Sequence, residues 1–166
     1  MTPGPPAPVG TTHDRAQLAL AGLAQRYTQG RRSLVGVLAG ARHPLSMAEI
    51  LAAQPRLAGS TAYRNLAVLA DAGVVRRMSG ADDFDRFELT EAISGLHHHH
   101  HLVCSGCASM LDVAAVPRLE RALDEAARLA AEETGFAVGD HRIDLVGLCR
   151  SCQGAPAGRA PEATPR

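Results

Sequence analysis

The sequence predicts an α+β protein with two small domains. Three observations carry this prediction: helical periodicity fills the first half, two short strand-like runs follow it, and the second half combines short strands with one long amphipathic helix. Hydrophobic residues make up 46% of the chain, enough to bury a core. We expect ordered domains over residues 14–92 and 96–152, with disordered Pro- and Gly-rich ends over residues 1–13 and 153–166.

The first domain contains four segments with the apolar spacing of helices. AQLALAGLAQRY and GRRSLVGVLAGAR form the first two. In HPLSMAEI, Ser46 precedes Glu49 by three residues, a capping box that predicts a helix from Met47. A further helix is expected to start at Ser60, its N-cap, and to end at Gly73.

Two predicted strands, VVRRM and DRFELT, flank the turn-rich segment SGADDFD. Helices, a turn, a helix and a hairpin in this order make a winged helix-turn-helix, whose second helix enters the major groove of DNA with its N-terminal end. The alternative is a solvated helix face with one core tyrosine. The candidate DNA-contacting residues are Ser60, Thr61, Tyr63, Arg64 and Asn65 of that helix and Arg76 and Arg77 of the hairpin.

The charge distribution favours a polyanionic partner for the first domain. The net charge is zero, but residues 1–80 hold nine Arg against three acidic residues, an excess of +6. The sequence shows neither a signal-peptide pattern nor an apolar run of roughly 18 residues, the length that spans a membrane. We therefore expect a cytoplasmic protein with no membrane partner.

Two CxxC pairs give the second domain its strongest chemical signal. Cys104 pairs with Cys107, and Cys149 pairs with Cys152. Four thiolates are the ligands of a tetrahedral structural Zn²⁺ site, and in a cytoplasmic chain this pattern indicates metal rather than disulfides. The strand, helix and strand expected between the pairs can bring their ends together. The alternatives are buried cysteines without a ligand and a redox CxxC.

Five consecutive histidines, residues 97–101, lead into the first CxxC pair. Successive side chains of a strand point to opposite faces, so His98 and His100 share one face and His99 and His101 share the other. One tract can therefore supply two separate metal sites, with His97 left unassigned. The tract is unlike a purification tag, because a tag lies at a terminus and does not run into a CxxC pair. The alternative to metal binding is a histidine tract exposed to solvent.

Each histidine pair needs further ligands. A site that joined His43 and Glu88 to His99 and His101 would link the two domains, so metal there could control DNA binding. The candidate ligands elsewhere in the chain are His43, Glu88, Asp112, Glu120 and His141.

Six segments together resemble the ferric uptake regulator family of bacterial metal-responsive repressors, over about residues 22–152. They are RYTQGRRSLVGVL, HPLSMAEI, STAYRNLAVLADAGVV, RFELTE, HHHHHLVCSGC and HRIDLVGLCRSC. The resemblance implies a structural zinc site at Cys104, Cys107, Cys149 and Cys152. It implies a regulatory hinge site at His43, Glu88, His99, His101 and Asp112, and a further site in a C-terminal dimerisation domain at His98, His100, Glu120 and His141. Tyr63 and Arg64 match recognition-helix residues that approach DNA.

The resemblance also implies a function. It indicates a homodimeric repressor, not an enzyme, that binds palindromic operator DNA when its regulatory site holds Zn²⁺ or Fe²⁺. The all-histidine tract is similar to that of the zinc-sensing (Zur) branch, which favours zinc-dependent control of metal-uptake genes. Because Glu88 would also suit Fe²⁺ or Mn²⁺, an iron- or manganese-sensing repressor is the alternative. A metal-storage or metal-delivery protein and a metalloenzyme are further alternatives, although no Ser or Cys nucleophile stands beside a base.

Overall fold

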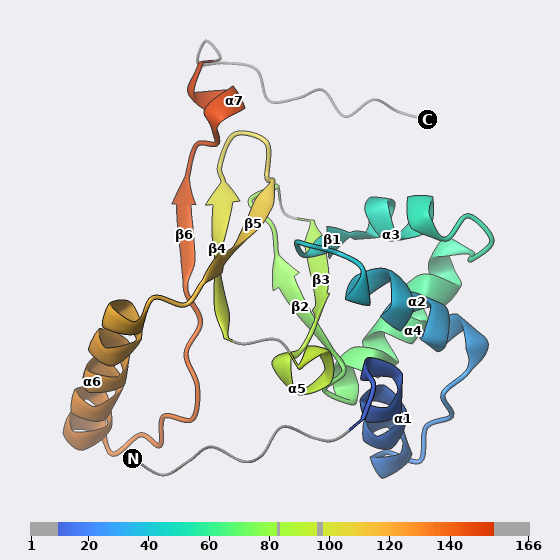
Figure 1. Cartoon of the computed structure of the whole chain (residues 1–166), viewed down its shortest axis with the longest axis horizontal. Helices are drawn as coiled ribbons and strands as arrows, with labels where there is room; N and C mark the ends of the chain where they lie inside the picture. The colour runs from blue at the N-terminus through green and yellow to red at the C-terminus, as the bar shows by residue number, and fades with distance from the viewer. Residues whose placement is uncertain (1–9, 83, 96–97, 155–166) are drawn as a thin grey trace. The chain divides into compact units, whose positions relative to one another are not determined.

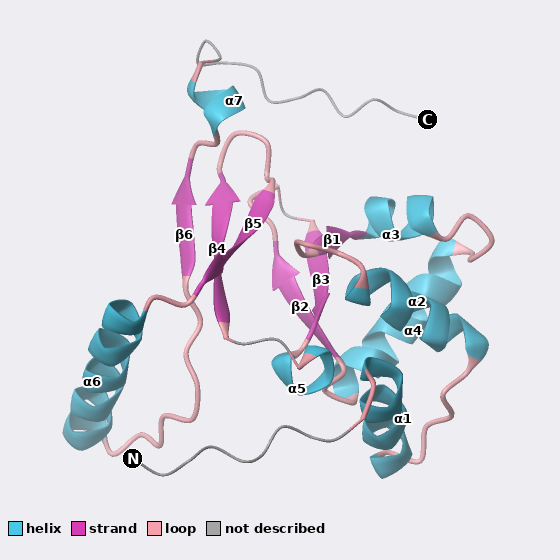
Figure 2. Cartoon of the chain, viewed as in Figure 1, coloured by secondary structure: helices cyan, strands magenta, loops and turns pink. Residues whose placement is uncertain are grey.

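The computed structural model describes residues 10–82, 84–95 and 98–154. It divides into two compact units, Met1–Leu96 and His97–Arg166. Each unit contains its own three-stranded sheet, with strand order β1-β3-β2 in the first and β5-β4-β6 in the second (Figures 1 and 2). The mixed α+β class that the sequence predicts is confirmed.

The first unit is a winged helix-turn-helix. Its helices are α1 (Thr12–Gly22), α2 (Gln29–Ala39), α3 (Met47–Ala53), α4 (Gly59–Asp71) and α5 (Glu91–Ser94). Its strands are β1 (Leu45–Ser46), β2 (Val75–Ser79) and β3 (Asp85–Leu89). The strands β2 and β3 form the predicted antiparallel hairpin, in which Arg77 lies opposite Phe87.

Capping explains where two of these helices begin. The capping box predicted for α3 is present, because Ser46 and Glu49 bond to each other's backbone N–H. The prediction for α4 was wrong by two residues, since the N-cap is Ala58 and Ser60 lies inside the helix. The carbonyl of Ala58 already accepts from the N–H groups of Thr61 and Ala62, both at 2.9 Å, so Ser60 has helical rather than capping geometry.

Both predicted disordered ends need correction where they meet the described residues. Helix α1 includes Thr12 and His13, because Thr11 and Asp14 form a second capping box that outweighs the Pro- and Gly-rich composition before it. At the other end, the short helix α7 (Arg150–Gln153) reaches into the predicted tail. The remaining parts of these predictions, residues 1–9 and 155–166, lie outside the described residues.

A hydrophobic core holds the first unit together and orients α4. Leu20, Leu34, Ile50 and Leu66 are fully or almost fully buried and come from four different helices. Phe87 of β3 packs into the same cluster. The core therefore fixes the buried face of α4 and leaves its polar face toward solvent.

The second unit is organised around β4 (His99–Cys104). This strand pairs antiparallel with β5 (Met110–Ala114) and parallel with β6 (Asp144–Gly147), and Figure 1 shows it between the two. Helix α6 (Pro117–Thr134) makes the crossover from β5 to β6; it begins at a proline and is followed by Gly135 in the left-handed conformation. No residue of α6 is fully buried in the single chain: Leu119 and Leu123 are half-buried, and Leu129 is exposed.

The core can be tested with a cavity-forming substitution. Leu66→Ala should lower the free energy of unfolding by about 2–5 kcal/mol, because the side chain is buried and its neighbours cannot fully refill the space. Urea unfolding followed by circular dichroism measures the change. Leu18→Ala is the matched control, since Leu18 is 75% exposed and its truncation should change stability little. Equal effects of the two substitutions would contradict the assignment of this core.

Candidate metal centres

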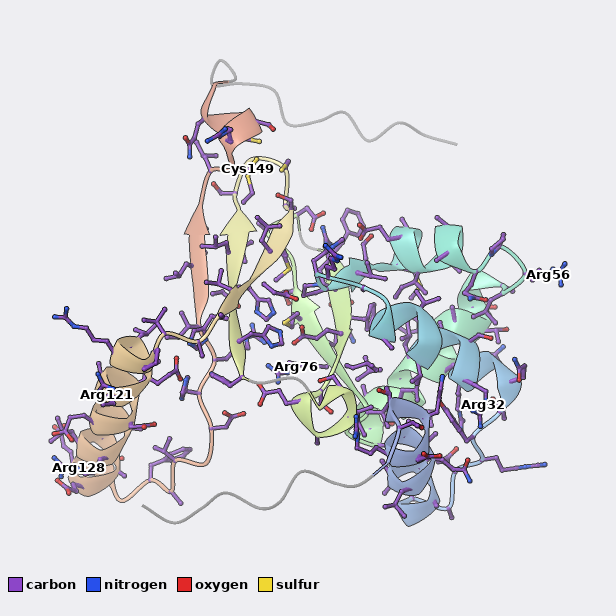
Figure 3. All side chains as sticks on the ribbon, viewed as in Figure 1. Arg32, Arg56, Arg76, Arg121, Arg128 and Cys149 are labelled. Atoms are coloured by element: carbon purple, nitrogen blue, oxygen red, sulfur yellow. The ribbon has the colours of Figure 1, made fainter. Side chains whose placement is uncertain are left out.

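Four cysteines meet at one end of the second sheet. Cys104 ends β4 and Cys107 lies in the turn that follows, while Cys149 and Cys152 come after β6. The parallel register places Cys104 opposite Gly147, so the chain beyond β6 returns to the first knuckle (Figure 3 labels Cys149). The four sulfur atoms lie within 4.8 Å of one another, a spacing that fits a Cys₄ zinc site.

Backbone amides prepare this cluster for a cation. The N–H groups of Cys149 and Gly106 donate to Cys104 Sγ at 3.3 and 3.4 Å, and such bonds lower the pKa of the Cys104 thiol to about 6. Hydrogen bonding to the neighbouring cysteine sulfurs, that of Cys149 first, instead raises the pKa of Cys152 to about 12. Binding of a metal ion by the four sulfurs would release thiol protons, so its affinity would depend on pH.

Gly106 is required by the close packing of this knuckle. A Cβ atom at position 106 would lie 3.0 Å from the sulfur of Cys152 and 3.2 Å from Leu148 Cδ2. A side chain at position 106 would therefore require Cys152 or Leu148 to shift by a few tenths of an ångström.

A second cluster combines three imidazoles with one carboxylate. Glu120 of α6 lies 2.7 Å from His100 Nε2 through one oxygen and 3.1 Å from His141 Nε2 through the other. His98 Nε2 lies 3.1 Å from His141 Nε2. The four potential ligand atoms lie within 4.8 Å of one another, and the hydrogen bond from His100 holds the pKa of Glu120 below its usual value. This set, which the sequence predicts, offers three nitrogens and one oxygen to a metal.

Access to this second cluster is uneven. His100 is buried, whereas His98, Glu120 and His141 line an open pocket of about 540 Å³. The other residues around the pocket include Asp124 and Asp140. An ion can therefore reach the cluster from solvent on the side away from His100.

A third group lies on the opposite face of β4. The rings of His99 and His101 are 5.1 Å apart, and His101 Nε2 lies 3.9 Å from Asp112 of β5. Potential ligand atoms of these three residues lie within 4.8 Å of one another. The two histidine pairs thus separate as strand alternation predicts. His97, the fifth histidine, lies outside the described residues.

Asp144 is a site residue that sequence reasoning missed. Its carboxylate oxygen lies 3.3 Å from Nδ1 of the buried His101, and its other oxygen accepts from Arg142 at 3.0 Å. A carboxylate on Nδ1 leaves Nε2 for a metal and fixes the ring, as partners of metal-bound histidines generally do. The role of Asp144 becomes visible only when the pairing of β4 with β6 is known, because that register places Asp144 beside His101.

Two predicted hinge residues belong to the first unit. Glu88 lies in β3, almost buried, with Arg76 directly opposite in the hairpin. His43 precedes β1, and its Nε2 lies 3.2 Å from Glu49. Among the described residues, His43 is part of no cluster of three or more potential ligands.

The candidate DNA-contacting side chains surround the start of α4 and the hairpin. Tyr63 is 50% exposed and Arg64 is also exposed. Arg77 is exposed and pairs with Asp85 at 2.6 Å. Arg76 differs, because it is half-buried and faces two carboxylates. The remaining candidates on α4 are Ser60, Thr61 and Asn65, of which Ser60 is exposed and the other two are half-buried.

Comparison with known proteins decides the family. Residues 23–146 match the model of the ferric uptake regulator family. The chain belongs to the ferric uptake regulator family. That family consists of transcription regulators, which agrees with the expectation that the chain is not an enzyme.

Individual members of the family are similar to this chain over part of its length. The peroxide-responsive repressor PerR of Staphylococcus saprophyticus is 34% identical over 99 residues, 60% of this chain and 60% of that protein. The chain thus spans about 60% of the length of the curated relatives it matches. The ferric uptake regulator of Vibrio cholerae is 27% identical with a TM-score of 0.62, over 80% of this chain and 98% of that one. The Helicobacter pylori regulator shares the fold, with a TM-score of 0.68, 20% identity, and coverage of 87% and 93%.

No helix in the described part of the chain is both long enough and apolar enough to cross a bilayer.

Removing one sulfur tests the structural zinc site. Cys104→Ser should lose most of the bound Zn²⁺ and unfold at a lower temperature, because metal binding at such sites contributes folding free energy. Elemental analysis and thermal unfolding measure the two effects. Ser151→Ala, an exposed neighbour of Cys152, is the control and should keep its zinc. Unchanged zinc content in the cysteine variant would refute this site.

Proposed function

We propose that this ferric uptake regulator family member is a homodimeric repressor that binds palindromic operator DNA when its regulatory site is loaded with metal. The observation that carries this proposal is the joint presence of a winged helix-turn-helix unit and a strand whose alternating histidines face two ligand groups. A DNA-reading element and metal ligands in one chain are the two parts that metal-dependent DNA binding requires.

The regulatory site is proposed to combine ligands from both units. His99, His101 and Asp112 form a ligand group within the second unit. We assign Glu88 and His43 of the first unit to the same metal on the strength of the family resemblance. A bound divalent ion would supply the positive charge that holds these donors together, and Asp144 would keep Nε2 of His101 available to it.

Zinc is the metal we propose for regulation, and the predicted outcome is control of metal-uptake genes. Imidazoles are good ligands for Zn²⁺, and three of the five proposed ligands are histidines. Two carboxylates in the same set also suit Fe²⁺ or Mn²⁺, so an iron- or manganese-sensing repressor is the second candidate. The second cluster, with three imidazoles and Glu120, is proposed as an additional metal site of the dimerisation domain.

The DNA contacts are proposed for the exposed end of α4 and the hairpin. Tyr63 and Arg64 project from the first turns of the helix, where winged-helix proteins approach base edges. Arg77 and the hydroxyls of Ser60 and Thr61, with Asn65, suit phosphate or base-edge contacts. Uncovered apolar side chains on α6, such as Leu129 at 51% exposure, are the surface we propose for dimerisation.

A gel-shift experiment tests the function directly. The full-length protein should retard DNA from upstream of its own coding sequence in the presence of Zn²⁺ and leave it free after chelation. Fe²⁺ under anaerobic conditions and Mn²⁺ are run in parallel, and the ion that acts at the lowest buffered free concentration is the one sensed. Retention of zinc without retardation of any promoter fragment would favour a metal-storage or metal-delivery protein instead.

Substitution of one proposed regulatory ligand tests the regulatory site without disturbing the fold. His99→Ala should raise the metal concentration for half-maximal DNA binding by at least about tenfold, since a ligand is lost. The dimer should persist in size-exclusion chromatography. His13→Ala is the control, because this histidine contacts Tyr27 and belongs to no cluster of ligands among the described residues. If His99→Ala binds DNA with the same metal dependence as the wild-type protein, the assignment of His99 as a regulatory ligand is wrong.

A further inference from the structure

Arg76 and Glu88 form an ion pair inside the hairpin of the first unit. The two residues are direct cross-strand partners of β2 and β3. Arg76 Nε lies 3.6 Å from Glu88 Oε1, and the two side chains are only 25% and 10% exposed. An ion pair this shielded from water interacts more strongly than one at the surface.

The same guanidinium has a second acidic neighbour. Arg76 Nη2 lies 3.9 Å from an oxygen of Glu91, in the first turn of α5. The Glu91 side chain is 33% exposed, so it is better solvated than that of Glu88. Arg76 therefore has an alternative partner within reach if Glu88 takes another cation.

Arg76 and Arg77 have different environments although they are adjacent. Arg77 is 53% exposed and pairs with Asp85. Side chains of neighbouring strand residues point to opposite faces, so only Arg77 shares the surface of the candidate DNA contacts. The sequence predicts both residues as DNA contacts, and the ion pairs of Arg76 favour a further role for it.

We propose that Arg76 competes with the regulatory metal for Glu88 and thereby raises the metal concentration at which the protein responds. This inference rests on the proposed function, in which Glu88 is a metal ligand. Arginine stays charged at any physiological pH, so it cannot leave the carboxylate by losing a proton. A divalent ion at Glu88 would repel the guanidinium toward Glu91, because two cations beside one carboxylate repel each other.

If Arg76 competes with the metal, its removal should change metal affinity in the opposite direction from that expected if Arg76 only supports Glu88. If Arg76 merely held Glu88 in place, its removal would weaken metal binding. If Arg76 competes, Arg76→Gln should tighten Zn²⁺ binding at the regulatory site by about fivefold, the scale of one partly shielded ion pair. Competition of the full-length protein with a chromogenic chelator measures this affinity, and the binding step lost in Glu88→Gln identifies the regulatory site.

Arg56→Gln is the charge-matched control. Arg56 is an exposed residue of the same unit, in the loop before α4, and Figure 3 labels both arginines. Its removal takes away the same charge without touching Glu88, so Zn²⁺ affinity should stay at the wild-type value. An equal gain in both variants would show general electrostatics and overturn the competition.

A double-mutant cycle separates this inference from the proposed function. Arg76→Gln should have no effect on Zn²⁺ affinity in the Glu88→Gln background, because the carboxylate for which Arg76 and the metal compete is absent. If Glu88→Gln alone leaves Zn²⁺ binding unchanged, the assignment of Glu88 as a ligand fails. If Glu88→Gln weakens binding but Arg76→Gln does not tighten it, only the competition fails.

A second variant keeps the test independent of the folding of Arg76→Gln. Glu91→Gln removes the alternative partner, so Arg76 should remain on Glu88 and Zn²⁺ binding should weaken by a few-fold. The effect should disappear when Arg76→Gln is also present. A loss of affinity that persists in that double variant would mean that Glu91 acts on the metal by its own charge, and the competition would be overturned.

Discussion

The central position of β4 is the constraint on which the metal chemistry of this protein depends. The strand is bonded on both sides, so His101 has fixed neighbours in Asp112 and Asp144. Because side chains alternate with a period of two, a slip of one residue would exchange the faces of every histidine. The flanking ladders therefore keep the two ligand groups apart, and the same parallel pairing brings the two cysteine knuckles together.

The acidic residues of the candidate sites already have cationic or hydrogen-bonding partners in the chain. Glu120 bonds to His100, Asp144 to His101, and Glu88 pairs with Arg76. Such networks keep ionisable groups satisfied without a metal, which avoids the cost of buried unpaired charge. A metal must then replace protons or a guanidinium, so part of its binding free energy is used to break these existing interactions. The metal affinity is lowered by this amount, which raises the metal concentration at which the site fills.

Much of this arrangement could be predicted from the sequence, and the rest depends on contacts between distant residues. The CxxC pairs, the histidine alternation, the hairpin and the capping box of Ser46 are local patterns with a physical reason. The two-residue strand β1 exists only by pairing with β3, and Asp144 becomes a partner of His101 only in the folded register. The start of α4 was misplaced because serine at position 60 suits a cap by composition, while the backbone of Ala58 makes the cap.

The parallel pairing of β4 with β6 also has a consequence for how the chain acquires its structure. His101 and Asp144 are 43 residues apart, and no residue of the helix between them is fully buried in the single chain. Contacts of such long range form late, since the entropy of closing the loop is lost before the ladder compensates. Until β6 arrives, one edge of the histidine strand is open to other chains. Because Cys149 and Cys152 directly follow β6, a zinc ion shared with Cys104 and Cys107 would hold β6 at that edge.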